Sequence, residues 1–240
     1  MVDWAADGCV HFGQDPRVDQ WARAAAKAAH RVDRSEKRHG GTWFVGVDAL
    51  PNTKDGAIDG VPLDGPWSSL VTPPAEWHRA QLSIVYPGYP QKDTDESETA
   101  HRFRRNRDAA HMDGLLPEGS ARRRHLREPH GFILGLPLAD TADSPLVVWR
   151  GSHKIMQAAF ARAFDGIDPA SWGDVDVTEI YQDARREVFK TCARVALPAR
   201  MGEATLLHRH LIHGVAPWGD GAAPRPIAYF RPLIAPQDWL

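Results

Sequence analysis

Short apolar runs separated by turn-forming residues dominate the second half of the 240-residue chain and restrict its fold more than any other feature. Each run suits a β-strand, and Gly, Pro or Asp stands between most of them. Two stretches of helical spacing interrupt the series. This pattern predicts a mainly β sandwich or barrel with helical decoration, and not the alternating strand–helix units of a parallel sheet. The runs cover residues 130–138, 144–152, 193–199, 203–215 and 225–234, and the helical stretches cover 154–164 and 177–190.

The first part of the chain adds one clear helix and two strands. Residues 15–34 predict a helix, because Asp15 can cap it, Pro16 suits its first turn and alanines fill its interior. Residues 41–50 and 81–89 are typical of strands. The stretch between them is rich in Pro, Gly and Asp and is expected to be a loop.

The length fits a single domain over residues 1–240. We expect residues 81–235 to form the β core and to carry the helical insertion at about 154–190. Residues 1–80 are expected to form an extension of helix and strand that packs on this core.

The composition of the chain limits which kinds of binding partner we expect. The net charge of −2 gives no reason to expect nucleic acid or a charged membrane surface. No apolar run approaches the roughly 20 residues of a membrane span, and the N-terminal segment lacks the pattern of a signal peptide. Two distant cysteines, Cys9 and Cys192, do not make a disulfide framework, so a cytoplasmic location is expected. We therefore expect a small-molecule substrate, with the oligomeric state left open.

Two short motifs offer metal ligands. In HMD (111–113), His and Asp two residues apart on extended backbone point to the same side. Alone, this pattern also fits an ordinary solvated loop. The second motif, HRHLIHG (208–214), holds three histidines. His208 and His210 would share one face of a continuing strand, whereas His213 would face the other way unless the chain bends. A zinc site made from these three histidines is therefore disfavoured.

The surroundings of His213 indicate a different metal site. It precedes a glycine and is followed by a loop and then a strand that carries arginines. Two histidines and one carboxylate on one face of a metal leave the opposite positions open, an arrangement diagnostic of non-haem Fe(II) oxygenases. The open positions can take a bidentate 2-oxo acid and O₂. The far carboxylate of that acid needs a cation, and the planar fork of an arginine suits it.

Four pieces of sequence, taken together, resemble the phytanoyl-CoA dioxygenase family of Fe(II)- and 2-oxoglutarate-dependent oxygenases. Their order and spacing across residues 81–232 fit the family, and residues 1–80 carry none of the resemblance. It implies a double-stranded β-helix, the cupin-like jelly roll. The pieces are HMD (111–113), SPLVVWRGSHK (144–154), GEATLLHRHLIHG (202–214) and Arg225, which stands twelve residues after His213.

The resemblance also implies a role for individual residues. His111, Asp113 and His213 would be the catalytic iron ligands, and Arg225 would bind the far carboxylate of 2-oxoglutarate. Arg231, deeper in the last strand, is the rival for that role. The implied cofactors are Fe(II), the cosubstrate 2-oxoglutarate and O₂. Halogenases of this fold generally have a small residue at the position of Asp113, so a carboxylate there predicts hydroxylation or another oxidation.

The expected activity is oxidation of a small organic substrate, with release of succinate and CO₂. One alternative is a cupin-like dioxygenase, or another metalloenzyme, that uses the same three ligands without 2-oxoglutarate. Another is a catalytically silent ligand-binding protein of the same fold. Gln81, Ser83 and Tyr86 are candidates for positioning the cosubstrate, whereas Val215 offers no polar side chain to assist the carboxylate.

Several basic residues lie outside these motifs. The run at 121–130 is most simply a solvated face, but its arginines, with the run at 101–107, could also rim the site and favour an anionic substrate. For the other histidines we expect His153 to hydrogen-bond the backbone, His208 to be packed or next to the metal ligands, and His210 to be exposed.

Overall fold

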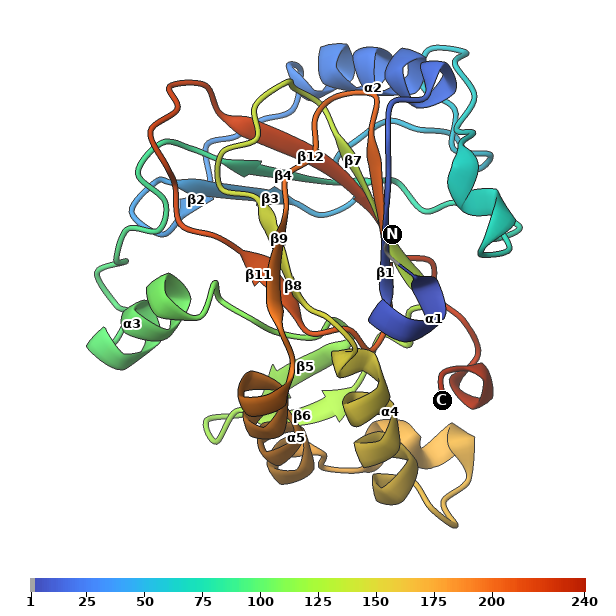
Figure 1. The fold of residues 1–240 in the computed structure, drawn as a ribbon, viewed down its shortest axis with the longest axis vertical. Helices are drawn as coiled ribbons and strands as arrows, with labels where there is room; N and C mark the ends of the chain where they lie inside the picture. The colour runs from blue at the N-terminus through green and yellow to red at the C-terminus, as the bar shows by residue number, and fades with distance from the viewer. Residues whose placement is uncertain (1–2) are drawn as a thin grey trace.

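The computed structural model describes residues 3–240 of the chain (Figure 1). Its strands are β1 (Cys9–Phe12), β2 (Lys37–Arg38), β3 (Trp43–Gly46), β4 (Gln81–Val85), β5 (Leu115–Glu118), β6 (Arg123–Leu126), β7 (Phe132–Pro137), β8 (Leu146–Trp149), β9 (Arg194–Leu197), β10 (Ala204–His208), β11 (His213–Val215) and β12 (Arg225–Phe230). Its α-helices are α1 (Trp4–Asp7), α2 (Pro16–Ala29), α3 (Glu98–Asn106), α4 (Ser152–Ala163) and α5 (Thr178–Thr191). Short 3-10 helices cover Pro66–Ser69, Pro169–Asp174 and Pro236–Asp238.

Two antiparallel sheets form the centre of the molecule. The major sheet has the order β1-β10-β7-β12-β4-β3-β2, and the minor sheet has the order β11-β8-β9. Apolar side chains of both sheets meet in one cluster, in which Ile133 and Leu207 of the major sheet join Leu146 and Val148 of the minor sheet. The expected mainly β fold with helical decoration, a double-stranded β-helix, is confirmed.

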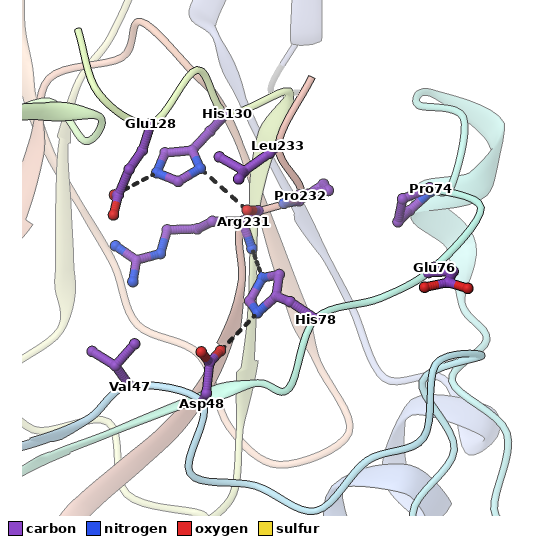
Figure 2. A pocket seen from close by; sticks show the side chains of 10 residues that line it. All are labelled: Val47, Asp48, Pro74, Glu76, His78, Glu128, His130, Arg231, Pro232 and Leu233. Carbon is purple, nitrogen blue, oxygen red and sulfur yellow. Dashed lines mark hydrogen bonds and ion pairs between the residues drawn. The ribbon is translucent and has the colours of Figure 1, made fainter. Parts of the chain in front are cut away.

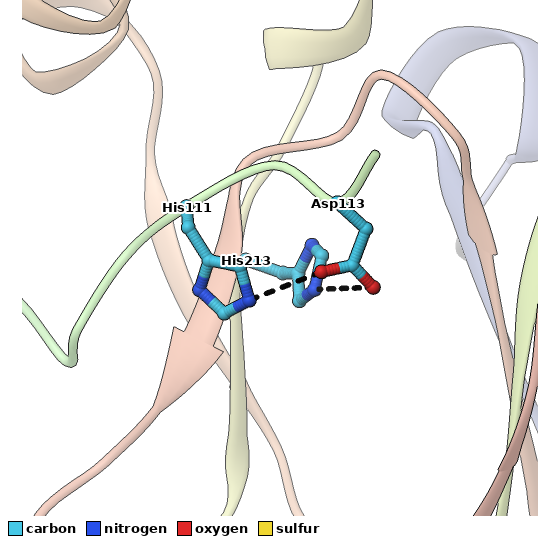
Figure 3. A group of neighbouring side chains, drawn as sticks. All are labelled: His111, Asp113 and His213. Atoms are coloured by element: carbon cyan, nitrogen blue, oxygen red, sulfur yellow. Dashed lines mark ion pairs between the residues drawn. The ribbon is translucent and has the colours of Figure 1, made fainter. Parts of the chain in front are cut away.

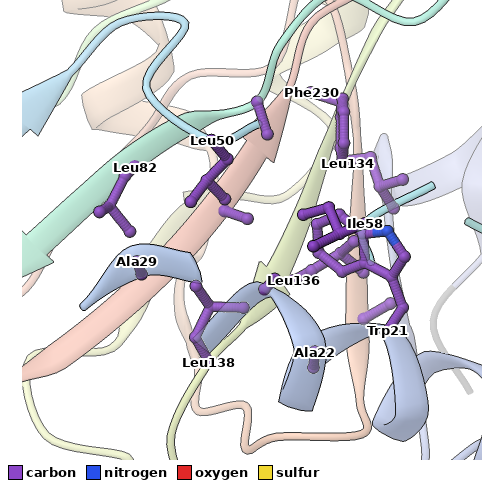
Figure 4. Packing of buried hydrophobic residues seen from close by; sticks show 14 of the residues in the cluster. Trp21, Ala22, Ala29, Leu50, Ile58, Leu82, Leu134, Leu136, Leu138 and Phe230 are labelled. Carbon is purple, nitrogen blue, oxygen red and sulfur yellow. The ribbon is translucent and has the colours of Figure 1, made fainter. Parts of the chain in front are cut away.

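Helix α2 covers the other face of the major sheet (Figure 1). As predicted, it begins after Asp15, whose carboxylate accepts the backbone N–H of Arg17 at 2.9 Å. It ends at Ala29, earlier than expected. Its apolar stripe, with Trp21 at the centre, packs on Leu134 and Phe230 of β7 and β12 (Figure 4). Burial of such a stripe against a sheet is the main source of stability for a helix of this length.

Helices α4 and α5, the predicted insertion, pack on each other beside the β5–β6 hairpin at the opposite end of the molecule from α2 (Figure 1). Their apolar cluster also holds Met112, the central residue of HMD. The metal-ligand motif is therefore anchored by the residue between its two polar members.

Some features differ from the sequence-based picture. The polar connection before HMD holds helix α3, and the basic run at 121–130 contributes strand β6. Residues 1–80 supply β1, β2 and β3 to the major sheet, which also draws on the segment after residue 81. The single-domain division itself stays a prediction. Within residues 3–240, no helix is both long enough and apolar enough to cross a membrane.

Candidate metal centre

The backbone brings the two predicted histidine ligands side by side. The N–H of His111 donates to the carbonyl of His213 at 2.8 Å, and the N–H of His213 donates to the carbonyl of His111 at 2.9 Å. This isolated antiparallel bridge adds one residue of extended chain to the edge of the minor sheet, beside β11. The two imidazole centroids lie 4.7 Å apart. Residues about a hundred positions apart in the sequence are thus fixed by a reciprocal hydrogen-bond pair.

Asp113 completes the group (Figure 3). His111 Nε2 lies 3.2 Å from Asp113 Oδ1, and His213 Nε2 lies 3.9 Å from Asp113 Oδ2. One ligand atom from each of the three residues falls within 4.8 Å of the others. The two-residue spacing of HMD therefore places both polar side chains on one side, as predicted.

The outer nitrogen of each imidazole is tied to the backbone two residues earlier. His111 Nδ1 lies 2.9 Å from the carbonyl of Ala109, and His213 Nδ1 lies 2.9 Å from the carbonyl of Leu211. A carbonyl can only accept, so both Nδ1 atoms carry the hydrogen. In a neutral ring Nε2 is then left with a free lone pair that points toward Asp113. A hydrogen bond from the outer ring nitrogen to a carbonyl fixes the tautomer and the orientation of metal-bound histidines, so the residues present fit a divalent metal ion.

Electrostatics favour the protonation states that a metal requires at His213 and Asp113, but not at His111. Burial lowers the pKa of His213 to about 4, so this imidazole is neutral at pH 7. Burial alone would raise the pKa of Asp113, but the hydrogen bond from His111 and the charge of Arg231 hold it well below its ordinary value. For His111, burial opposes protonation, yet the hydrogen bond and charge of Asp113 outweigh it and raise the pKa. A bound cation would displace that proton.

Close backbone packing explains the glycine after His213. A Cβ on Gly214 would lie 2.1 Å from the carbonyl oxygen of Asp108, which accepts the N–H of Val215 at 2.8 Å. The carboxylate of Asp108 is itself held by Arg194 through two bonds of 2.7 Å. No larger residue at position 214 fits this approach, and the approach keeps the segment before HMD against β11.

A cavity of about 180 Å³, which we call the inner cavity, opens beside these three side chains. Strands β3, β4 and β12 form one wall. Gln81 and Ser83, both proposed from the sequence, line it, whereas Tyr86 does not and instead packs under Lys37 Nζ at 4.3 Å. The lining residues are Trp43, Val45, Gln81, Ser83, His111, Asp113, Ile133, Leu146, His213, Gly214, Val215, Tyr229 and Arg231.

The two candidate arginines occupy different environments. Arg225 is only 5% exposed, and no carboxylate within residues 3–240 lies within 4.0 Å of it. Its position on β12 puts it on the same face as Tyr229, a lining residue of the inner cavity, although Arg225 itself does not line it. Arg231 does line it, and its Nη1 donates to Asp113 Oδ2 at 3.2 Å and its Nη2 to Gln81.

The remaining histidines of HRHLIHG form a separate buried group with His153. The prediction that His210 is exposed was wrong: strand β10 ends at His208, the chain turns, and His210 becomes fully buried. His153 Nε2 meets the carbonyl of Ala5 at 3.3 Å, as expected for a structural residue. In the part of the chain that the structure describes, these ring nitrogens do not converge into a metal-binding group. We call His153, His208 and His210 the buried histidine cluster.

A second polar group, which sequence reasoning missed, combines His39, Asp93 and Glu96. Arg104 Nη1 lies 2.7 Å from His39 Nε2, and Arg104 also bonds Glu96. A guanidinium thus already occupies the space that a cation would need, so this group ties α3 to the β2–β3 region.

The basic run at 121–130 does not rim the inner cavity. Arg127 bonds Glu118 at 2.9 Å across the β5–β6 hairpin, Arg124 stacks over Tyr181 at 5.0 Å, and Arg123 pairs with Asp176 at 3.4 Å. These arginines therefore give no support to an anionic substrate. The signal that could have found Tyr229 is the two-residue period of the last strand, which places residues 225, 227 and 229 on one face.

No family model matches the chain, and no curated protein matches its sequence. The non-heme α-ketoglutarate-dependent carbocyclase SnoK from nogalamycin biosynthesis superposes with a TM-score of 0.48 at 15% identity, covering 95% of this chain and 81% of that one. HygX from Streptomyces hygroscopicus, with nickel and 2-oxoglutarate bound, gives 0.48 at 14%, with coverage of 95% and 83%. EctD from S. alaskensis gives 0.45 at 16%, with coverage of 95% and 73%. At such values the likeness concerns general architecture and carries nothing about substrate, and membership of the phytanoyl-CoA dioxygenase family stays a prediction.

Proposed function

We propose that the protein is an Fe(II)- and 2-oxoglutarate-dependent oxygenase. The observation that carries the proposal is the convergence of His111 Nε2, His213 Nε2 and the Asp113 carboxylate beside the inner cavity, with both Nδ1 atoms tied to backbone carbonyls. All three ligands come from one side, so the remaining coordination positions of a bound ion would face the cavity. Two histidines and a carboxylate in this facial arrangement suit Fe(II) better than a closed structural zinc site.

Arg225 supports 2-oxoglutarate as the cosubstrate. A buried guanidinium without a carboxylate partner is unfavourable until an anion reaches it. Burial lowers the pKa of Arg225 by penalising its charged form, and the nearby Tyr229 opposes that shift. The far carboxylate of 2-oxoglutarate would supply the missing anion through a bidentate contact. Arg231 is the weaker candidate because Asp113 already engages its guanidinium.

In this proposal His111, Asp113 and His213 hold the metal, and Arg225 orients the cosubstrate. When bound, Fe(II) with 2-oxoglutarate and O₂ would supply an oxidation in which 2-oxoglutarate becomes succinate and CO₂. The apolar walls, among them Ile133 and Leu146, exclude water from the site. Because Asp113 would occupy the position that a halide needs, we propose hydroxylation-type chemistry on a small organic molecule. We also propose that the protein is cytoplasmic.

The test is 2-oxoglutarate-dependent succinate formation by the full chain reconstituted with Fe(II). We expect His111→Ala and Asp113→Ala to lose both Fe(II) binding and the visible charge-transfer band of an Fe(II)–2-oxoglutarate chelate. Arg225→Ala should retain Fe(II) and weaken 2-oxoglutarate binding, whereas Arg225→Lys should restore part of it. Unchanged binding of Fe(II) and 2-oxoglutarate in the two ligand variants would contradict the proposal.

One observation favours a second candidate, a metal-dependent dioxygenase that binds its substrate directly and uses no 2-oxoglutarate. Arg225 does not line the inner cavity. Under this alternative, 2-oxoglutarate would change neither the thermal stability of the metal-loaded protein nor its spectrum, and the Arg225→Ala variant would retain full metal-dependent activity.

A further inference from the structure

Figure 2 shows the residues that line a larger cavity of about 360 Å³, which we call the outer cavity. It adjoins the metal centre through Arg231. It lies at the end of the major sheet where β3 and β12 finish and β4 and β7 begin. Arg231 lines both cavities and contacts Asp113, so a ligand in the outer cavity would sit next to the candidate metal ligands. Nothing in the proposed function assigns a role to this space.

The charge of the outer cavity is negative. Asp48, Glu76 and Glu128 line it, and within residues 3–240 no lysine or arginine nitrogen lies within 4.0 Å of the carboxylates of Asp48 or Glu128. Glu76 differs, because Lys54 pairs with it at 3.0 Å. The charge of Arg231, the cavity's one arginine, is already engaged by Asp113. A cation is therefore the ligand that this space would attract.

His130 supplies an independent sign of a missing hydrogen-bond donor. This residue is 5% exposed, and its Nδ1 lies 3.1 Å from the carbonyl of Arg231, so Nδ1 carries the hydrogen. Its Nε2 is buried and has no hydrogen-bond partner, although Glu128 Oε2 lies 3.3 Å away (Figure 2). In the neutral ring two acceptors then face each other at 3.3 Å, too close for a third atom to lie between them, and a donor that approaches Glu128 from the cavity would draw its carboxylate away from this unfavourable contact.

The second histidine of the outer cavity has no such free atom. His78 Nε2 accepts the backbone N–H of Arg231 at 2.7 Å, and its Nδ1 donates to the carbonyl of Arg79 at 2.7 Å. His78 therefore fixes the backbone that carries Arg231. Apolar side chains lie near the opening: Val47 is 68% exposed and Leu233 is 64% exposed, the two most exposed large hydrophobic residues described. They offer contact area for the carbon frame of a ligand.

We propose that the outer cavity binds the oxidisable substrate and that this substrate is an organic cation, with a protonated amine bound by Glu128 beside His130 and an apolar part against Val47 and Leu233. The substrate role rests on the proposed function, whereas the preference for a cation rests on the cavity alone. An ammonium group supplies hydrogen-bond donors to the Glu128 carboxylate, and its positive charge balances the negative charges of Asp48 and Glu128.

The experiment compares three probes of equal length: hexylamine, hexanol and hexanoate. Ligand-observed NMR titrations of the full chain give their dissociation constants without and with Mn(II) at the metal centre. We expect hexylamine to bind about tenfold more tightly than hexanol, because a charge-assisted hydrogen bond adds to the same apolar contact, and hexanoate to bind most weakly. Bound Mn(II) should enhance relaxation of the hexylamine protons, and His213→Ala should abolish that enhancement.

Variants identify the site. Glu128→Gln should weaken hexylamine binding about tenfold and leave hexanol binding unchanged, and Asp48→Asn should produce a smaller loss in the same direction. Glu179→Gln, an exposed carboxylate on α5 outside both cavities, is the matched control and should bind as the wild type does. Thermal unfolding of each variant verifies that it is folded.

The outcomes separate the two proposals. Equal binding of the three probes, with succinate formation intact, would overturn the cation site and leave the proposed function standing. Selective hexylamine binding without any 2-oxoglutarate-dependent succinate would support the cation site and remove its role as a substrate site. Selective binding without Mn(II)-enhanced relaxation would likewise overturn the substrate role, because the amine would then lie away from the metal.

Discussion

The histidines of HRHLIHG belong to two groups, and the surroundings of their ring nitrogens differ. His213 pairs with His111 at the inner cavity, and each ring has one nitrogen tied to a backbone carbonyl and the other facing Asp113. In the buried histidine cluster, His208 Nδ1 accepts the N–H of His210 at 3.2 Å, and both ring nitrogens of His210 lack partners.

The difference shows that proximity of imidazoles does not make a metal site. The ring of His210 packs edge-on against Trp239 with centroids 4.3 Å apart, and burial holds its pKa well below the ordinary value. It is used as a neutral aromatic surface. His213 becomes a ligand candidate because the backbone orients it and a carboxylate from elsewhere in the chain meets it.

The largest expected effect is the difference in activity between a variant of His213 and a variant of His208. His213→Ala should reduce 2-oxoglutarate-dependent succinate formation by more than about 100-fold, because loss of a ligand exceeds the roughly 10–100-fold effect of removing a residue that only hydrogen-bonds a ligand. His208→Asn should keep activity, since the amide oxygen can still accept the N–H of His210. Steady-state rates and bound Fe(II) measure both. Equal losses in the two variants would mean that the groups are not functionally distinct.

Replacement of Gly214 tests whether the close backbone packing beside β11 is what positions His213 as a ligand. In Gly214→Ala, the new Cβ would meet the carbonyl of Asp108 at 2.1 Å, and that oxygen cannot move without disturbing the segment before HMD. We expect a loss of about 3 kcal/mol in the free energy of unfolding, together with weaker Fe(II) binding. Urea unfolding and metal titration measure the two effects.

Gly13→Ala is the matched control, because nothing lies within 4 Å of the added Cβ. If Gly214→Ala were as stable as Gly13→Ala and bound Fe(II) normally, the close approach of Asp108 would not be what positions His213.

A smaller effect concerns the acid sensitivity that His208 gives to the buried histidine cluster. Burial lowers the pKa of His208 to about 3, whereas the unfolded chain has the ordinary value near 6.5. Between pH 6.5 and pH 3, His208 is protonated in the unfolded chain but neutral in the folded protein. The free energy of unfolding therefore decreases as the pH falls from 6.5, and it stops changing with pH near pH 3. From pH 7 to pH 5 this residue alone should remove about 2 kcal/mol.

His208→Asn removes that titration. Denaturant unfolding at pH 7 and pH 5 should therefore show a smaller acid loss in the variant than in the wild type, by about the same 2 kcal/mol. An identical loss in both proteins would show that His208 does not contribute, and the acid sensitivity would then belong to the other buried histidines.

Local signals predicted the parts of the molecule that short-range rules determine. A capping aspartate, an early proline and an alanine-rich interior were enough for α2, and the period of two on extended backbone was enough to bring His111 and Asp113 to one side. Pairing with His213 depended on the order of motifs along the chain, which the resemblance supplied.

Features that depend on distant partners escaped prediction. His210 is buried because the chain turns after His208 and Trp239, from the C-terminal end, packs on it. Helix α3 has no buried residue and so no apolar stripe to reveal it. The contact of Arg231 with Asp113 needs the sheet register that joins β12 to β4. Sequence spacing alone contains none of these.

The smallest expected effect concerns a third set of basic side chains, on the β5–β6 hairpin, which contributes to neither histidine group. Arg127 is bonded to Glu118 across the hairpin, and both side chains are more than a third exposed. Arg127→Ala should change kcat/KM by less than about twofold, because an exposed ion pair is largely screened by solvent and salt. A tenfold rise in KM for the substrate, with kcat unchanged, would instead place this hairpin at the site. Such a rise would restore the anionic substrate that the basic run first suggested and contradict the acidic outer cavity as its binding site.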